Sequence, residues 1–324
     1  MWRFTVLCAF FILLCSQETF AASKNEKVKG YATAYGFVLG QDFSLGKIGE
    51  KHPELASAVK LARLRFDAAF PKVKDKLDTK IKKIAGDDIY KQLQGQISSE
   101  IEKTLGDEKF TRDQAVTFLS EMEERSKGEI PPPALEYLLA AQYATAPVNE
   151  FLDGHRTRFS SKGHKKASGI DVVLQVPKSW EAGESERPHL VQNWTSRNDA
   201  VVEGIMLLVE NMGATDKEIK AFIKSGEFKE ATAGGKRLKS GTFTIENQPG
   251  YWVEYSQLQE RVGEKFYQHL RLDQFFFRGR AISLLCVVTG AKNEKKLVDD
   301  SFSRIQPLCK QVLNSVVLPQ VSER

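Results

Sequence analysis

Cysteine is scarce in this sequence, with four residues in 324. No two of them form a Cys-x-x-Cys motif, which argues against thioredoxin-type redox chemistry and against zinc sites built on that motif. Cys8 and Cys15 lie in the first apolar run, so Cys286 and Cys309 remain in the body of the protein. We predict a disulfide between these two, because disulfides persist in the compartments to which exported proteins go. The alternative is two buried, unpaired thiols, since free cysteine also favours cores.

Long hydrophobic runs are also lacking. The apolar run Phe4–Cys15 is shorter than the roughly 20 residues that span a bilayer, and no later stretch is long enough. It follows Arg3, and small residues stand one and three positions before a cleavage point after Ala21. This pattern predicts a secretory signal peptide over residues 1–21, and a mature protein in the periplasm or outside the cell with no transmembrane segment. The alternatives are an uncleaved anchor, and a lipoprotein anchor on Cys15, for which the preceding Leu14 is too bulky.

A strong excess of one charge is missing too. Residues 22–150 contain 20 basic and 20 acidic side chains, whereas residues 151–324 contain 26 basic and 21 acidic ones. The excess of five is mild, and nucleic-acid binders cluster basic residues far more heavily on one face. We therefore expect no nucleic-acid partner.

Catalytic motifs with a known mechanism are absent. The sequence has no Gly-x-Ser-x-Gly elbow, no His-Glu-x-x-His, no phosphate-binding loop and no Gly-x-Gly-x-x-Gly after a strand. Its five histidines are scattered among different predicted elements: His52, His155, His164, His189 and His269. We predict that the protein is not an enzyme and uses no metal and no cofactor. The alternative is a hydrolase with a site outside the known motifs, for which His189 and His269 would need to meet across neighbouring strands.

The first half of the chain has helical periodicity. Apolar residues recur every three or four positions from Leu55 to Ile84 and again from Ile89 to Leu105, with a break expected at Pro71. Thr111 with Gln114 predicts a capping box. We expect a helical domain over residues 22–152, packed as a bundle or an extended hairpin. Its narrow apolar stripes could instead seat a second subunit, which would make the protein a homodimer through this domain.

A basic segment, residues 153–169, separates the two halves. It contains five basic side chains besides two histidines, and no acid after Asp153: Arg156, Arg158, Lys162, Lys165 and Lys166. Its glycines and serines predict a mobile, solvated linker. The functional alternative is a clamp for anionic partners such as lipid headgroups or envelope polymers.

The second half has the pattern of an antiparallel sheet with two helices, in the order βββαββββα. The predicted strands are 170–176, 190–195, 201–209, 238–245, 251–258, 265–277 and 281–288, and the helices begin near 216 and 293. The chain is therefore expected to be α+β, with a helical domain followed by an α/β sandwich over residues 170–318 and a tail over 319–324.

Two local features of this half carry further predictions. Gln248-Pro249-Gly250-Tyr251 has proline and glycine where a type II turn requires them. Phe275, Phe276 and Phe277 are consecutive, so in a strand at least one ring must lie on the second face of the sheet. That ring is either covered by a helix or part of a binding surface, and we take these three residues as candidate contacts.

Residues ~165–318 resemble the PsbP-like and DcrB-like superfamily of small exported α/β sandwich domains. The resemblance rests on the opening strand that leads into Pro177-Lys178-Ser179-Trp180, on Gln248-Pro249-Gly250 before a strand of alternating aromatics, and on a closing helix that ends in residues 312–316. It implies binding and assembly roles rather than a shared reaction, and it transfers no catalytic residues.

These observations favour an exported binding or accessory protein of the cell envelope. The expected contact surface combines Phe275–Phe277 with the basic segment, because interfaces commonly have an apolar centre and a charged rim. The partner would be a protein or an envelope component. The alternatives are the hydrolase described above and a secreted factor aimed at a host or competitor.

Overall fold

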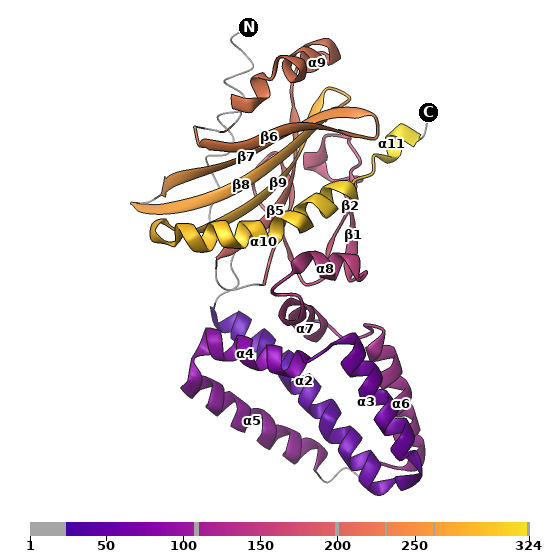
Figure 1. Ribbon diagram of the computed structural model, residues 1–324. Helices are drawn as coiled ribbons and strands as arrows, with labels where there is room; N and C mark the ends of the chain where they lie inside the picture. The colour runs from indigo at the N-terminus through magenta and orange to yellow at the C-terminus, as the bar shows by residue number, and fades with distance from the viewer. Residues whose placement is uncertain are drawn as a thin grey trace. The chain divides into compact units, whose positions relative to one another are not determined.

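A computed structural model describes residues 24–106, 110–197, 201–230, 232, 234–261 and 263–322. The predicted signal peptide, residues 1–21, lies outside this range. The chain divides into two compact units, a helical unit within Ala22–Ala144 and a sheet unit within Thr145–Arg324 (Figure 1). No helix in the described ranges is both long enough and apolar enough to cross a membrane.

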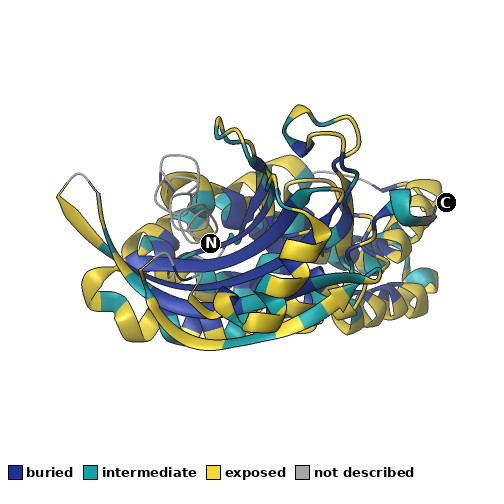
Figure 2. Ribbon diagram, turned by 90° about the horizontal axis from the view of Figure 1, so that it is seen from above, coloured by how far each residue is buried: buried dark blue, intermediate teal, exposed yellow. Residues whose placement is uncertain are grey.

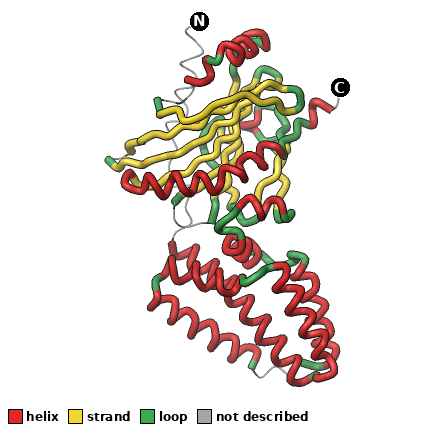
Figure 3. Tube along the Cα trace, in the orientation of Figure 1, coloured by secondary structure: helices red, strands yellow, loops and turns green. Residues whose placement is uncertain are grey.

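The helical unit consists of six α-helices and one short 3-10 turn in the described residues. They are α2 (Lys24–Lys51), η3 (Pro53–Leu55), α3 (Ala56–Ala69), α4 (Val73–Ala85), α5 (Asp87–Leu105), α6 (Arg112–Ser126) and α7 (Ala134–Gln142). Their apolar stripes meet in one core around α2, α4 and α7, as predicted from the periodicity. Figure 3 shows this unit as helices joined by short loops.

Local sequence signals set the ends of these helices. The hydroxyl of Thr111 accepts the N–H of Gln114 and the Gln114 side chain accepts the N–H of Thr111, so the predicted capping box is confirmed. The break expected at Pro71 separates α3 from α4. Within α2, a Cβ on Gly30 would lie 2.0 Å from the ring of Tyr137, so only glycine allows α7 to approach this closely.

The sheet unit is built on a seven-stranded antiparallel sheet with the strand order β3-β4-β5-β9-β8-β7-β6. The strands are β3 (Glu181–Gly183), β4 (Leu190–Thr195), β5 (Val202–Asn211), β6 (Lys236–Ile245), β7 (Gln248–Arg261), β8 (Glu264–Phe277) and β9 (Arg280–Ala291). A separate antiparallel pair is formed by β1 (Arg156–Ser160) and β2 (Val173–Pro177). The helices and short turns are α8 (Pro147–Leu152), η4 (Lys165–Ala167), α9 (Asp216–Ser225), η5 (Glu227–Glu230), η6 (Lys292–Glu294), α10 (Lys295–Asn314) and α11 (Pro319–Ser322).

The two faces of the sheet belong to two different cores. The long helix α10 lies along one face, and its apolar stripe packs on β5, β8 and β9 (Figure 1). On the other face, α9 and η5 pack on one end of β7 through Phe222, Phe228 and Tyr251. The central strands are buried over most of their length (Figure 2). The α+β class and the order of the predicted strands and helices are therefore confirmed. Strands β1 and β3 are additions, and the first predicted strand, β2, pairs with β1 outside the seven-stranded sheet.

The expected boundaries need three corrections. The units divide between Ala144 and Thr145, because α8 packs on α10 and β2 of the sheet unit. Residues 153–169 are not a free linker, since they hold β1 and η4 and donate backbone hydrogen bonds to the rest of this unit. Within the predicted tail, Pro319–Ser322 form α11, and Gln320 donates a hydrogen bond to the carbonyl of Gly169.

The predicted type II turn at Gln248 is also wrong. Residues Gln248, Pro249 and Gly250 belong to β7, and the chain reverses at Glu246 and Asn247, whose φ angles are 49° and 61°. Pro249 is tolerated because it stands before the point at which β7 begins to pair with β8, so no ladder hydrogen bond to β8 is lost. Between β8 and β9 the chain reverses at Arg278 and Gly279, and both of these φ angles are positive.

Candidate functional site

The three consecutive phenylalanines lie in the protein core. Phe275 and Phe277 belong to the core beneath α10, and Phe276 packs on the opposite face, with its ring 6.2 Å from that of Tyr251. At most 6% of any of these side chains is exposed. The expected split over two faces is confirmed, but the rings cannot form the apolar centre of a contact surface, because both faces are covered where they lie.

The basic segment does present its charges to solvent. In β1, Arg156 and Arg158 are two residues apart and therefore lie on the same face of the strand, and both are exposed. Phe159 lies on the opposite face of β1 and points toward the core, where its ring meets that of Trp194 edge to face at 5.1 Å. The guanidinium of Arg156 lies over the ring of Phe151 in α8, 5.2 Å from its centre. This cation–π contact holds the Arg156 side chain against α8.

A cleft of about 450 Å³ opens beside this strand. It is lined by residues from the loop after β1, from the residues before β2 and from α11: Ser161, Lys162, Gly163, His164, Lys165, Gly169, Ile170, Asp171, Pro319 and Gln320. Lys162 and Lys165 are exposed, whereas Lys166 is half-buried and donates from Nζ to the carbonyl oxygen of Ser185. Of the five predicted basic residues, four therefore face solvent, and two of these line the cleft.

Hydrogen bonds hold the frame of the cleft in place. The buried hydroxyl of Ser161 donates to the carbonyl oxygen of Ile170 at 2.9 Å. The side-chain amide of Gln320 donates to the Gly169 carbonyl at 2.8 Å, and its oxygen accepts the N–H of Asp171 at 3.2 Å. Gln320 thus connects α11 to Gly169 and Asp171, about 150 residues earlier in the sequence. These bonds fix the backbone of the segment that carries Lys162 and Lys165.

Charges in the cleft are mixed, with the positive ones in excess. The carboxylate of Asp171 accepts the hydroxyl of Ser160 at 2.8 Å, so part of its hydrogen-bonding capacity is used internally. The Nδ1 of His164 accepts the N–H of Lys166 at 3.3 Å, which places the proton of the neutral ring on Nε2. Arg278 does not line the cleft, but it donates to the carbonyl oxygen of Gln320 at 3.4 Å and so lies beside it. The arrangement can attract an anion and donate hydrogen bonds to it.

A second cluster of charged residues lies between α10 and the sheet; His269 and Glu254 are buried, and Asp299 of α10 is half-buried. The Nδ1 of His269 is 2.8 Å from Oδ1 of Asp299, its Nε2 is 3.4 Å from Oε1 of Glu254, and its ring stacks on Phe302 at 3.9 Å. Burial raises the pKa of Asp299, but Lys295 and His269 outweigh it and leave that pKa below its usual value. Burial also raises the pKa of Glu254, but the hydrogen bond and the charge of His269 oppose this effect. The net result is a pKa below the usual value.

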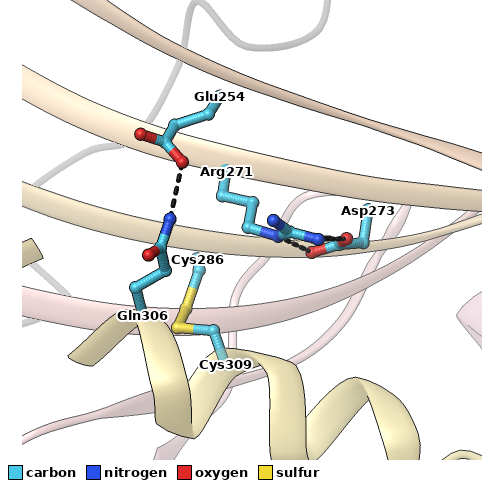
Figure 4. Close-up of a disulfide and its surroundings, with 6 residues drawn as sticks. All are labelled: Glu254, Arg271, Asp273, Cys286, Gln306 and Cys309. Atoms are coloured by element: carbon cyan, nitrogen blue, oxygen red, sulfur yellow. Dashed lines mark hydrogen bonds and ion pairs between the residues drawn. A yellow bond between two sulfur atoms is a disulfide. The ribbon is translucent and has the colours of Figure 1, made fainter. Parts of the chain in front are cut away.

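An arginine–aspartate pair lies next to it on the same strand. The guanidinium of Arg271 makes a bidentate contact to Asp273, with Nε 2.9 Å and NH2 2.6 Å from the two carboxylate oxygens (Figure 4). The ring of Trp252 covers the guanidinium at 4.2 Å. Burial raises the pKa of Asp273, and Arg271 opposes that effect. The two residues are i and i+2 in β8 and share the face toward α10.

The predicted disulfide joins this region to the helix. Cys286 of β9 and Cys309 of α10 are bonded, with 6.2 Å between their Cα atoms (Figure 4). One turn earlier on α10, the amide of Gln306 donates to Glu254 at 2.6 Å. The helix is therefore attached to three successive strands, β7, β8 and β9, by the Gln306, Asp299 and Cys309 contacts.

The sequence pointed to His269 only as a possible partner of His189, so this cluster was missed. Tyr267, His269, Arg271 and Asp273 alternate through β8, and that period of two places them all on one face. Four polar residues on the face toward an amphipathic helix are the signal that could have revealed it. His189 does not meet His269, since it immediately precedes β4, and β5 and β9 lie between β4 and β8. Among the described residues, no group of three or more His, Cys, Asp or Glu side chains is placed to hold a metal ion.

Similarity to known proteins is confined to solved structures. No protein-family model and no curated protein matches the chain. PsbP from the cyanobacterium Synechocystis is 14% identical over 51% of this chain and 92% of its own, with a TM-score of 0.31. LpqN of Mycobacterium tuberculosis, a protein involved in cell envelope biogenesis, is 15% identical over 49% of this chain and 93% of its own, with a TM-score of 0.30. A Pseudomonas aeruginosa protein of unknown function is 13% identical over 51% and 97%, with a TM-score of 0.27. Each of these similarities covers about half of this chain and more than nine-tenths of the other protein.

Proposed function

We propose that this is an exported accessory protein of the cell envelope that binds an anionic envelope component. The contact would be made by the basic surface, which we define as the side chains of Arg156, Arg158, Lys162 and Lys165. The observation that carries the proposal is the exposure of these four cations on a strand and a cleft whose backbone is fixed by internal hydrogen bonds. A fixed frame loses little conformational entropy on binding, which favours affinity.

Export is supported by the cysteines. The disulfide between Cys286 and Cys309 is of the kind that persists in oxidising compartments and is rare in the cytosol. The predicted signal peptide, in an independent part of the sequence, also indicates export.

The state of His269 favours binding over hydrolysis. A histidine that acts as a general base is oriented by a carboxylate at one ring nitrogen and reaches the reacting group with the other. In His269 both nitrogens face carboxylates, and one face of the ring is covered by Phe302. Glu254 is in turn held by Gln306. The network is closed within the protein, and it is better suited to hold α10 on the sheet.

The proposal is tested with two anionic probes, vesicles that contain phosphatidylglycerol and a soluble anionic polysaccharide, with phosphatidylcholine vesicles as the neutral reference. We expect the mature protein to bind at least one anionic probe, with an affinity that falls as salt is added. A quadruple variant that replaces the basic surface by alanine should lose this binding.

The matched control removes four other exposed lysines, Lys217, Lys220, Lys224 and Lys236, and leaves the basic surface intact. It carries the same net charge as the quadruple variant, so it separates a local site from a general effect of charge. Equal loss of binding in both variants, or no binding of the natural sequence to either anionic probe, would contradict the proposal.

A further inference from the structure

Helix α5 is largely uncovered within its own unit. Of its 19 residues, Tyr90 alone is buried among those described. Its apolar residues Leu93, Ile97 and Ile101 follow one another at intervals of four, so they form one stripe, yet each is only half-buried. The stripe continues to Ile89, which is 53% exposed. An isolated helix of this length is marginal in water, and most helical stability comes from burying such a stripe.

The stripe borders an open groove between α5 and α2. The groove has a volume of about 510 Å³. Its α2 side is formed by Val28, Ala32 and Gly36. Their side chains are small and do not fill the space between the two helices. At Gly36 the two helices are in contact, since a Cβ there would lie 3.5 Å from the side chain of Ile97. The groove is therefore apolar, elongated along two helices and open to solvent.

Charges of opposite sign stand on its two sides. Lys29 lies on α2 and Glu100 lies on α5, and both line the groove. In the described part of the chain, neither side chain forms an ion pair. A surface that carries one cation and one anion beside a single apolar stripe is complementary to itself when it is turned by a two-fold rotation.

We propose that this groove is the interface of a homodimer, with a second copy of the chain as its occupant. In this arrangement the α5 stripe of each protomer enters the groove of the other, and Lys29 faces Glu100 of the partner subunit. Such an interface is isologous, because the same patch is used on both protomers. Helix α5 has 19 residues and is therefore about 28 Å long, so the contact extends over about five helical turns. The proposal is independent of the basic surface, which lies in the sheet unit.

Charge reversal tests the symmetry directly. The mass of the full mature chain is measured in solution by light scattering or sedimentation over a range of concentrations, for the natural sequence and for Lys29→Glu, Glu100→Lys and the double variant. The natural protein should be a dimer. Each single variant brings like charges together and should weaken self-association by roughly tenfold or more. The double variant should restore the dimer.

Mixing the two single variants gives the decisive outcome. The Lys29→Glu chain has two acids at the groove and the Glu100→Lys chain has two bases, so each contact between the two chains is attractive. We therefore expect the mixture to form heterodimers although neither variant associates with itself. A charge effect confined to one chain cannot produce this result, since it would not depend on mixing.

A control variant, Lys91→Glu, reverses an exposed charge on α5 that does not line the groove, and it should remain dimeric. Circular dichroism establishes that each variant is folded. The inference is overturned if the natural protein stays monomeric at micromolar concentration, if the folded single variants dimerise as the natural protein does, or if their mixture contains no heterodimer.

Discussion

The carboxylate of Glu150 accepts two hydrogen bonds from Ser179, one from the backbone N–H at 2.8 Å and one from the hydroxyl at 2.6 Å. Glu150 lies in α8 and is 1% exposed, and Ser179 lies in the corner that follows β2. Burial raises the pKa of Glu150 from 4.5 to about 7, although Ser179 and the charge of Arg197 oppose the shift. The pair joins α8 to the sheet unit through a group that titrates near neutral pH.

Stability should therefore depend on pH through Glu150. Its folded-state pKa is raised, so the folded protein binds the proton more tightly than the unfolded chain does. The contribution is complete below the ordinary pKa of 4.5 and is lost as pH rises to about 7. We expect the free energy of unfolding to fall by up to roughly 3 kcal/mol over this range. In Glu150→Gln this part of the decrease should be missing.

Urea unfolding of the natural protein and of Glu150→Gln at several pH values measures the difference. Glu186→Gln, which alters an exposed carboxylate, is the matched control and should follow the natural protein. The interpretation fails if Glu150→Gln and the natural protein lose the same stability between pH about 4.5 and about 7.

Removing the disulfide should destabilise the fold. Cys286 and Cys309 are 23 positions apart, and closing a loop of this size is worth about 3 kcal/mol in the chain-entropy description. We expect Cys286→Ser/Cys309→Ser to lower the free energy of unfolding by roughly that amount. Alkylation of the unfolded, unreduced natural protein, followed by mass measurement, should find no free thiol at these positions. Two alkylated cysteines would disprove the bond.

Substitution in the buried pair Arg271–Asp273 should lower the free energy of unfolding far more than substitution in an exposed pair. Asp273→Ala leaves a buried guanidinium without its carboxylate, which should cost about 3–5 kcal/mol of stability. Arg237 and Glu230 form an exposed pair on the same unit, at 3.3 Å, and Glu230→Ala should cost less than about 1 kcal/mol. Chemical denaturation of both variants measures the contrast. Similar losses for the two would mean that Arg271 is solvated in solution.

Substitution of the phenylalanine run should act on folding, not on partner capture. Phe275 is fully buried beneath α10, so Phe275→Ala should cost about 3–5 kcal/mol. Protein that remains folded at low temperature should bind the anionic probes as the natural sequence does. A folded Phe275→Ala variant with specific loss of binding would restore the aromatic run as a contact surface.

Much of this fold could be predicted because its signals are local. Period-two patterns located β4 at Leu190–Thr195 and the other long strands to within a few residues. The capping box was recognised from two residues alone, Thr111 and Gln114. The turn before β7 was misplaced because Pro249-Gly250 outweighed Glu246-Asn247, although asparagine also tolerates positive φ.

The candidate sites were less accessible, since their partners are distant in the sequence. His269 meets Glu254 and Asp299, 15 and 30 residues away, and Gln320 closes the cleft at Gly169 from 151 residues away. Periodicity shows which side of a strand is buried, but it does not show which element covers it. Composition alone identified the basic residues. The fixed conformation of their loop depends on contacts with distant residues such as Gln320, which composition does not show.

The central claim is that the basic surface is where this protein meets its partner. The most direct measurement is a titration of the isotope-labelled mature protein with short-chain phosphatidylglycerol and with the anionic polysaccharide, followed by NMR of the backbone amides. We predict that the largest shifts occur at Arg156, Arg158, Lys162, Lys165 and Gln320, and that they diminish as salt is added. Shifts centred on His269 and Asp299, with the amides of the basic surface unchanged, would contradict the account and favour the hydrolase.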